Sequence, residues 1–371
     1  MLFFTLIIFL ILYLLIDRIY KEDNTKRSKI ALFCTLFLIF LSGFRNLAVG
    51  IDTAYYVYSM KATSDIPIRE VFTSFFDRYF SPSNAGGKDP GFMVFEKLFS
   101  IFSTDSTIYL LLIGSIFLIP LKSFFLKYTH TFWELTFSYI IYITLFYGYL
   151  PNAAIRQSIA MAFWLLVCSR IEDLNWKKIT ILILFASFIH QSILAGLIIL
   201  AFPKIKNIKL YYLICGGLFF VMFFIGSAFA SFLTSHSDVY SAYANSDYYL
   251  NNTKPYSFIF FMFVIYVIGL IQIKNKKFVS DNLFLYKLFG ISICLTPLIL
   301  VQPNFQRFTA IFAIGMCAFV SRCLSEYSSF IRKIAYATLL IVLMYSTYNN
   351  QYKFNWQKME LHDRYLYMNI K

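Results

Sequence analysis

The chain has 371 residues, of which 59% are hydrophobic and only 14% are charged. Soluble domains carry about 25% charged residues, so this composition excludes a soluble globular protein and indicates a polytopic helical membrane protein. The net charge of +14 does not indicate a nucleic-acid partner, because the basic residues form short clusters between apolar runs, as in cytoplasmic loops that fix topology. The cysteines lie within or beside apolar runs without metal-ligand or disulfide spacing, and we expect them to be small core residues.

Apolar runs that approach the length of a spanning helix, about 20 residues, recur along the whole chain. They lie at residues 2–16, 29–44, 107–126, 132–150, 154–170, 210–232, 255–273, 282–301, 307–323 and 333–349. The run at 2–16 has no basic region before it and no small-residue cleavage site after it, which favours a retained span over a signal peptide. We therefore expect an all-α polytopic membrane protein, a single transmembrane domain over residues 1–371 with about 10 spanning helices.

Clusters of lysine and arginine between these runs predict the orientation of the chain. Cytoplasmic loops are enriched in both residues, and clusters follow the runs that end near residues 16, 126, 170, 202, 273 and 323. If all the clusters are cytoplasmic, the N-terminus and the C-terminus lie outside, and so do the loops at 44–106 and 233–254. We expect these two outer loops to face the substrate.

The apolar run at 179–202 has basic clusters on both sides, so a single straight span would violate the charge rule. We expect a re-entrant or broken helix pair, with its break at residues 188–192 and His190 at the apex. Unwound backbone at membrane depth is tolerated where protein or a water-filled cavity covers it. An ordinary span with a basic exit is the alternative.

A shorter apolar segment, residues 92–102, cannot span a membrane. Phe92, Phe95, Phe99 and Phe102 recur in it at helical spacing, which predicts an amphipathic helix at the outer interface.

Polar intrusions interrupt the apolar runs, and charge at membrane depth usually marks function. The first is residues 44–58, FRNLAVGIDTAYYVY, which places Arg45, Gly50 and Asp52 at the outer end of the second run. Arg45 can hold a phosphate in a two-pronged contact, Gly50 permits a turn, and Asp52 can act as a general base. The alternative is an ion pair between Arg45 and Asp52 that fixes the loop.

Two further intrusions contain Arg156 with Gln157, and His190 with Gln191. Arg156 lies at an outer helix end, where arginine is disfavoured, so we prefer a role in a site to a snorkelling side chain. His190 lies in apolar surroundings and is a candidate general acid or base. A hydrogen-bonded core histidine without a chemical role is the alternative.

Arg307 follows a proline and an asparagine at another outer helix end, in QPNFQRF at residues 302–308. With Arg45 and Arg156 it would form a cationic mouth that faces away from the cytoplasm, as a lipid-linked pyrophosphate requires. We expect no metal, because His190 has no second histidine near it in the sequence. We also expect no nucleotide cofactor, because the cytoplasmic loops are too short for a nucleotide-binding domain and lack a phosphate-cradling glycine loop.

Five motifs, spread in order over residues 45–310, resemble those of the EpsG-like branch of the Wzy polysaccharide polymerases. They are FRNLAVGIDTAYYVY, KDPGFMVFEKLFS, NAAIRQSIAMAF, FASFIHQSIL and QRFTAIF. The residues that carry the resemblance are Arg45, Gly50, Asp52, Tyr55, Tyr58, Asp89, Pro90, Gly91, Phe92, Arg156, Gln157, Ala160, His190, Ser192, Arg307 and Phe308. The stretch between Asp52 and Asp89 and the Tyr-rich residues 234–254 depart from the shared pattern, and we expect both to concern substrate choice.

The resemblance implies a glycosyltransferase of the bacterial inner membrane that joins oligosaccharide repeat units at its periplasmic face. The units would be carried on undecaprenyl pyrophosphate and the product would be O-antigen, capsule or exopolysaccharide. The implied catalytic residues are Arg156 and, as the base, His190 or Asp52. The implied residues for binding pyrophosphate and sugar are Arg45, Arg307, Gln157, Tyr55, Tyr58 and Asp89. The expected partners are these lipid-linked glycans and the bilayer, with a chain-length regulator and a flippase as further candidates.

A lipid-linked oligosaccharide flippase or transporter is the main alternative. It would line both halves of the bundle with polar residues, whereas the unusual charges here gather at outer helix ends, which favours chemistry there. An acyltransferase that decorates sugars would need a histidine–acid pair on the cytoplasmic or mid-membrane side, and the sequence does not indicate one.

Overall fold

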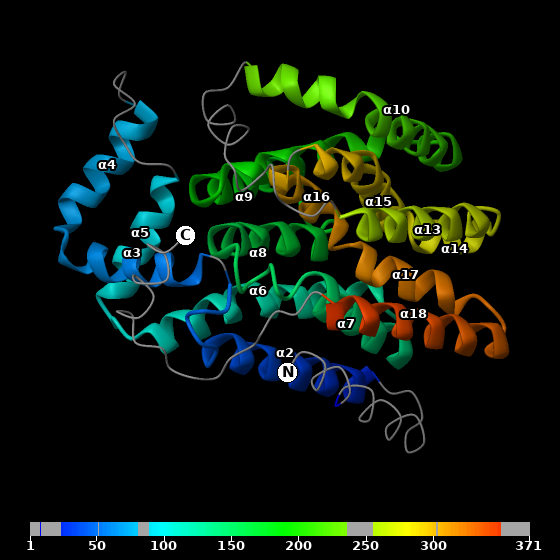
Figure 1. Ribbon diagram of the computed structural model, residues 1–371, viewed down its shortest axis with the longest axis horizontal. Coiled ribbons are helices and arrows are strands. Elements are labelled where there is room, and N and C mark those ends of the chain that lie inside the picture. Colours follow the sequence, from blue (N-terminus) through cyan, green and yellow to red (C-terminus); the bar gives the residue numbers. More distant parts are fainter. Residues whose placement is uncertain are drawn as a thin grey trace. The chain divides into compact units, whose positions relative to one another are not determined.

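The computed structural model describes residues 8, 24–50, 52–80, 89–235, 255–301 and 303–349, and every regular element in these ranges is a helix (Figure 1). The predicted all-helical class is therefore confirmed for the described chain. The chain divides into two compact units, Met1–Leu197 with Ser329–Lys371, and Ile198–Ser328. The predicted first span at 2–16 and most of the predicted outer loop at 233–254 lie outside the described residues, as do both chain ends.

The predicted number of about 10 spans is not confirmed. Within the described chain, three helical segments are long and apolar enough to cross a membrane: Ser106–Tyr128, Ile208–Gly226 and Leu283–Leu300. A fourth is added if Gln306–Ala313 and Met316–Ser325, which meet at a bend of 42°, count as one span. The predicted runs at 132–150, 154–170 and 255–273 form shorter apolar helices, Phe132–Leu145, Ile155–Ser169 and Tyr256–Gln272.

The first unit contains most of the described helices. They are α2 (Asn24–Gly43), α3 (Thr53–Asp65), α4 (Ile68–Phe80), α5 (Pro90–Ser100), α6 (Ser106–Tyr128), α7 (Phe132–Leu145), α8 (Ile155–Ser169), α9 (Trp176–Ile189), the start of the 3-10 helix η1 (Gln191–Lys204) and α18 (Ser329–Asn349). The long apolar helix α6 packs between α2 and α8, and α8 packs on α9 (Figure 1). Asp105 directly precedes α6 and is its N-cap residue. Its carboxylate accepts hydrogen bonds from the backbone N–H groups of Thr107 and Ile108 at 2.8 and 2.9 Å.

The region expected as an outer loop at 44–106 is folded into α3, α4 and α5, which lie together at one end of the long helices (blue to cyan in Figure 1). Apolar residues of α3 and α5 pack with residues of α6, α8 and α9 in one buried cluster. Its members are Tyr56, Val57, Met60, Phe92, Phe99, Tyr109, Leu110, Ile113, Ile155, Ile159 and Ile189. This cluster fixes α3 and α5 against the bundle, and α4 packs on α5.

The helix predicted at 92–102 and the break predicted at 188–192 can both be compared with the structure. The helix expected at 92–102 is α5, and its spacing places Phe92 and Phe99 on the buried face, together with Glu96. The break predicted at 188–192 is confirmed, because α9 ends at Ile189, His190 is extended at φ −155° and ψ 112°, and η1 follows. The return of this segment to the side from which it entered stays a prediction.

In its described residues, the second unit contains the rest of η1 and eight further elements. They are α10 (Ile208–Ser235), α13 (Tyr256–Gln272), α14 (Lys276–Asp281), α15 (Leu283–Leu295), η2 (Thr296–Leu300), η3 (Pro303–Phe305), α16 (Gln306–Ala313) and α17 (Met316–Ser325). Stacked rings of Tyr212 and Tyr266, 4.7 Å apart, join α10 to α13. The six cysteines of the chain are all free and at least half-buried, which confirms the expectation that they are core residues.

Candidate functional site

The site is centred on Asp89, which directly precedes α5. Its backbone is left-handed, at φ 54°, a region that Asp and Asn tolerate better than most residues. Pro90 follows in the first helical turn, where its missing N–H costs no hydrogen bond. At Gly91 a Cβ atom would lie 2.5 Å from the carbonyl oxygen of Phe188. The sequence Asp89-Pro90-Gly91 therefore starts α5 and lets it approach the end of α9 closely.

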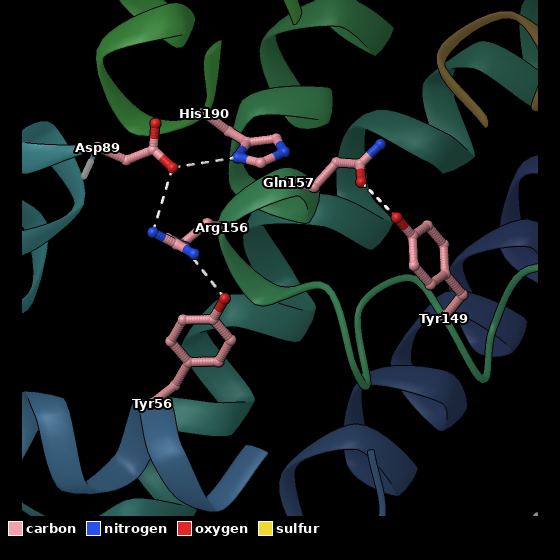
Figure 2. Close-up of polar contacts among 6 residues, drawn as sticks. All are labelled: Tyr56, Asp89, Tyr149, Arg156, Gln157 and His190. Atoms are coloured by element: carbon pink, nitrogen blue, oxygen red, sulfur yellow. Dashed lines mark hydrogen bonds and ion pairs between the residues drawn. The ribbon is translucent and has the colours of Figure 1, made fainter. Parts of the chain in front are cut away.

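This close approach brings Asp89 to Arg156 and His190 (Figure 2). One carboxylate oxygen of Asp89, Oδ2, lies 3.1 Å from Nη1 of Arg156 and 3.4 Å from Nδ1 of His190. Arg156 is in the first turn of α8 and His190 terminates α9. The side chains of Asp89, His190 and Arg156 are 1%, 8% and 21% exposed, so Arg156 is the most accessible member of this cluster.

Tyr56 of α3 completes the cluster. Its hydroxyl accepts a hydrogen bond from Nε of Arg156 at 3.0 Å, and its ring lies 5.5 Å from the guanidinium carbon, a cation–π contact. The guanidinium is thus held from two directions, by Tyr56 at Nε and by Asp89 at Nη1. Sequence reasoning named Tyr55 and Tyr58 but missed Tyr56.

Helical spacing is the signal that would have selected Tyr56. Thr53, Tyr56, Val57 and Met60 form the buried face of α3, in the i, i+3, i+4, i+7 pattern of a helix that packs on a core. Tyr55 points away from this face and is 65% exposed. Tyr58 is half-buried, and substrate contacts by Tyr55 and Tyr58 stay predictions.

Gln157, next to Arg156, contacts residues of α8 and of the segment that precedes it. Its Oε1 accepts a hydrogen bond from the hydroxyl of Tyr149 at 2.6 Å (Figure 2), and its Nε2 lies 3.9 Å from the sulfur of Met161. This arrangement ties the start of α8 to the segment that precedes it. Asp52 lies at the N-terminal end of α3 and makes no side-chain capping hydrogen bond to that helix.

Arg45 joins two turns of the backbone. It is buried and donates to the Ser42 carbonyl oxygen, to the Ser42 hydroxyl at 2.8 Å, and to the Asn152 carbonyl oxygen at 3.2 Å. Thr53 donates to the same Asn152 oxygen at 2.7 Å. Gly50 has φ +89°, and a Cβ atom there would clash with this oxygen, so the predicted turn at Gly50 is confirmed. These contacts show a structural role for Arg45, and its contact with substrate stays a prediction.

Arg307 belongs to the second unit, where it is half-buried in the first turn of α16. Its membership of the same site as Arg156 stays a prediction.

A second buried carboxyl group, Glu96 of α5, lies among α3, α5 and α6. Ser59 donates to its Oε2 at 2.7 Å and Tyr109 donates to its Oε1 at 3.1 Å. Burial raises the pKa of Glu96 to about 7, although both hydrogen bonds and the charge of Arg156 act in the opposite direction. Sequence reasoning did not assign Glu96 to the site.

The model of the EpsG family matches residues 28–360 of the chain. The chain belongs to the EpsG family. This is a family of Wzy-like polysaccharide polymerases, so the resemblance that the five motifs indicated is confirmed, and the chain is a polymerase-type membrane protein. No curated protein matches it, and no solved structure does.

In this EpsG family protein, the Asp89 cluster combines a cation with a group that can accept a proton. An ionised carboxylate can only accept hydrogen bonds, so the contact with Asp89 favours a proton on Nδ1 of His190 and leaves Nε2 as the basic nitrogen. Arg156 offers further N–H donors beyond those that point to Tyr56 and Asp89. Within the described residues there is no group of three or more His, Cys, Asp and Glu side chains that could hold a metal ion.

Proposed function

We propose that this protein is a membrane glycosyltransferase that polymerises oligosaccharide repeat units carried on undecaprenyl pyrophosphate, at the periplasmic face of the bacterial inner membrane. The product is O-antigen, capsule or exopolysaccharide. Membership of the EpsG family supports the reaction class. The single structural observation that carries the proposal is the cluster of Asp89, Arg156 and His190, three residues far apart in the chain whose side chains meet.

The reaction needs a proton acceptor and a cation. A hydroxyl oxygen of the acceptor unit attacks the anomeric carbon of the donor, the bond from that carbon to the pyrophosphate oxygen breaks, and the hydroxyl proton passes to a base. Negative charge develops on the departing undecaprenyl pyrophosphate, and a fixed guanidinium stabilises such charge. The donor linkage supplies the energy, so no nucleotide is required.

The geometry supports Arg156 as the group that meets the pyrophosphate, because it is the most exposed member of the cluster and is held by Tyr56 and Asp89. His190, oriented by Asp89, is our proposed base, with Asp52 as the alternative. Arg45 and Arg307 are proposed as further cations near the pyrophosphate, Gln157 as a further polar contact, and Tyr55 and Tyr58 as sugar contacts.

The proposal is tested by a gel of lipid-linked glycans from a strain that lacks this protein. We expect the ladder of chain lengths to collapse to a single repeat unit, and a plasmid that carries the wild-type chain should restore it. A complete loss of surface sugar with units retained inside would identify a flippase, and an unchanged ladder would contradict any role in polymerisation.

The hydroxyl of Tyr56 gives a finer test of how Arg156 is held. Tyr56→Phe keeps the ring but removes the acceptor for Nε, and we expect the initial rate of polymerisation to fall about fivefold, the effect of one hydrogen bond worth about 1 kcal/mol. Tyr256→Phe is the matched control, because Tyr256 is 56% exposed at the start of α13, in the other unit, and its variant should keep the wild-type rate. Equal rates for the two variants would contradict the positioning of Arg156 by Tyr56.

A further inference from the structure

The start and the buried face of α5 carry two buried carboxyl groups. Asp89 directly precedes the helix, Phe92 and Glu96 lie four residues apart on one side of it, and all three are buried. Asp89 binds Arg156 directly. Glu96, two turns further along α5, has no role in the chemistry proposed above, and yet its side chain is only 1% exposed.

Glu96 ties three helices together. Its two oxygens accept hydrogen bonds from Ser59 of α3 and from Tyr109 of α6. A buried carboxyl group is costly unless its oxygens are paired in this way. Its location within the apolar cluster of α3, α5 and α6 therefore requires both partners.

The same contacts determine where Tyr56 lies. Tyr56 and Ser59 are neighbours on one face of α3, and Phe92 and Glu96 are neighbours on the facing side of α5. The ring of Tyr56 contacts the ring of Phe92 edge-on, at 5.3 Å between centroids, and one turn away Ser59 binds Glu96 at 2.7 Å. The hydrogen bond between Ser59 and Glu96 thus fixes the register of α3 against α5. That register sets the position of the Tyr56 hydroxyl, which holds Arg156.

Glu96 also acts on the site by its charge. The ionisable groups that act on it are Arg156 from α8 and Tyr109 from α6. Burial raises the pKa of Glu96 to about 7, so that it is mostly neutral below this pH and mostly ionised above it. When it is ionised, Arg156 has a second carboxylate nearby in addition to Asp89, and its positive field is weaker.

We propose that Glu96 is a positioning residue of this site. It holds the face of α3 that carries Tyr56 in place next to Arg156, and its charge state sets how strongly Arg156 attracts a diphosphate. The inference rests on the proposed function, because it takes a diphosphate as the ligand of Arg156. Neutral Glu96 favours binding of the anion and ionised Glu96 opposes it. The contribution of Glu96 to binding therefore becomes less favourable as the pH rises through about 7.

The test measures binding of inorganic pyrophosphate to the purified full-length protein by calorimetry at pH 6 and pH 8.5. At each pH we measure the affinity of Glu96→Gln and that of the wild type and take their ratio. The pH dependence of pyrophosphate itself cancels in this ratio. We expect a ratio near one at pH 6 and about three to ten at pH 8.5, because the variant lacks the negative charge that opposes the anion. A ratio that is the same at both pH values overturns the inference.

Ser59→Ala provides an independent test that keeps the glutamate. The Ser59 hydrogen bond lowers the pKa of Glu96, so its loss should raise that pKa and shift the midpoint of the pH dependence upward. Ser64→Ala is the matched control, since Ser64 is on the same helix and donates to the Lys61 carbonyl oxygen at 2.6 Å. A wild-type midpoint in Ser59→Ala overturns the inference even if Glu96→Gln fails to fold.

Arg156→Ala separates this inference from the proposed function. Loss of pyrophosphate binding in Arg156→Ala, with a pH-dependent ratio for Glu96→Gln, supports both. If Arg156→Ala loses binding but the affinity ratio for Glu96→Gln is the same at both pH values, the role of Glu96 is overturned and the proposed function is not. Binding that persists in Arg156→Ala, or no binding by the wild type, overturns the diphosphate site itself and with it the inference.

Discussion

Replacing Arg156 by lysine should collapse the glycan ladder to single repeat units, as Arg156→Ala should. The guanidinium binds Tyr56 through Nε and Asp89 through Nη1 at the same time, and an ammonium group cannot reproduce this planar arrangement. The pyrophosphate contact then loses its fixed geometry. We expect the initial rate of polymerisation to fall about 100-fold or more, the size of effect seen when a preorganised donor to a developing charge is removed.

The matched control for this substitution is Arg170→Lys, because Arg170 is exposed at the other end of the same helix, α8. That variant should keep a normal ladder and a normal amount of protein in the membrane. A normal ladder from Arg156→Lys would contradict the account, since it would mean that Arg156 contributes only a positive charge.

The second large effect is expected for Asp89→Asn, which should lower the rate of polymerisation about 10²- to 10⁴-fold, the range that a general base contributes. Asparagine has the same size and also tolerates the left-handed backbone of this position, so α5 should still form. The variant loses the negative charge that faces Arg156 and orients His190. The rate is measured with purified protein and lipid-linked repeat units.

Asp105→Asn is the control for Asp89→Asn. Asp105 also precedes a helix, where it caps α6, and asparagine is an equally good N-cap residue. This variant should keep the wild-type rate. If Asp89→Asn also kept it, Asp89 could not be the residue that organises the site.

The pairing of Asp89, Arg156 and His190 was only partly predictable from the sequence. Each residue was a candidate on its own: Asp89 from a motif, Arg156 from an arginine at an unfavourable helix end, and His190 from the charges that flank its segment. Their convergence depends on the close approach of α5 to Phe188 at Gly91. That is a tertiary contact, which no local pattern encodes.

Other residues were missed or expected in a different role for similar reasons. Glu96 was expected on an interfacial helix, but its environment is decided by Ser59 and Tyr109, which belong to two other helices. For Arg45 the sequence did not indicate the structural role that the buried acceptor of the Asn152 backbone adds, and its contact with substrate stays a prediction. Gly50, whose role follows from its own backbone, was predicted correctly.

Hydrophobic runs predicted the helices better than they predicted the number of spans. The runs at 107–126 and 282–301 correspond to segments long enough to cross a membrane. The run at 307–323 is divided into α16 and α17 by the 42° bend, and the runs at 132–150 and 154–170 form shorter helices, α7 and α8. Composition identifies apolar sequence, whereas bends and 3-10 turns within it depend on packing.

Asp89 and Arg156 should act as one unit in polymerisation, and a comparison of the single variants with the double variant tests this. The initial rate is measured for Asp89→Asn, for Arg156→Lys and for the chain with both changes. Residues that act as a unit give non-additive effects, so we expect the double variant to be no slower than the slower single variant. A double variant whose loss equals the product of the two single losses would show that the residues act independently, and would contradict the account.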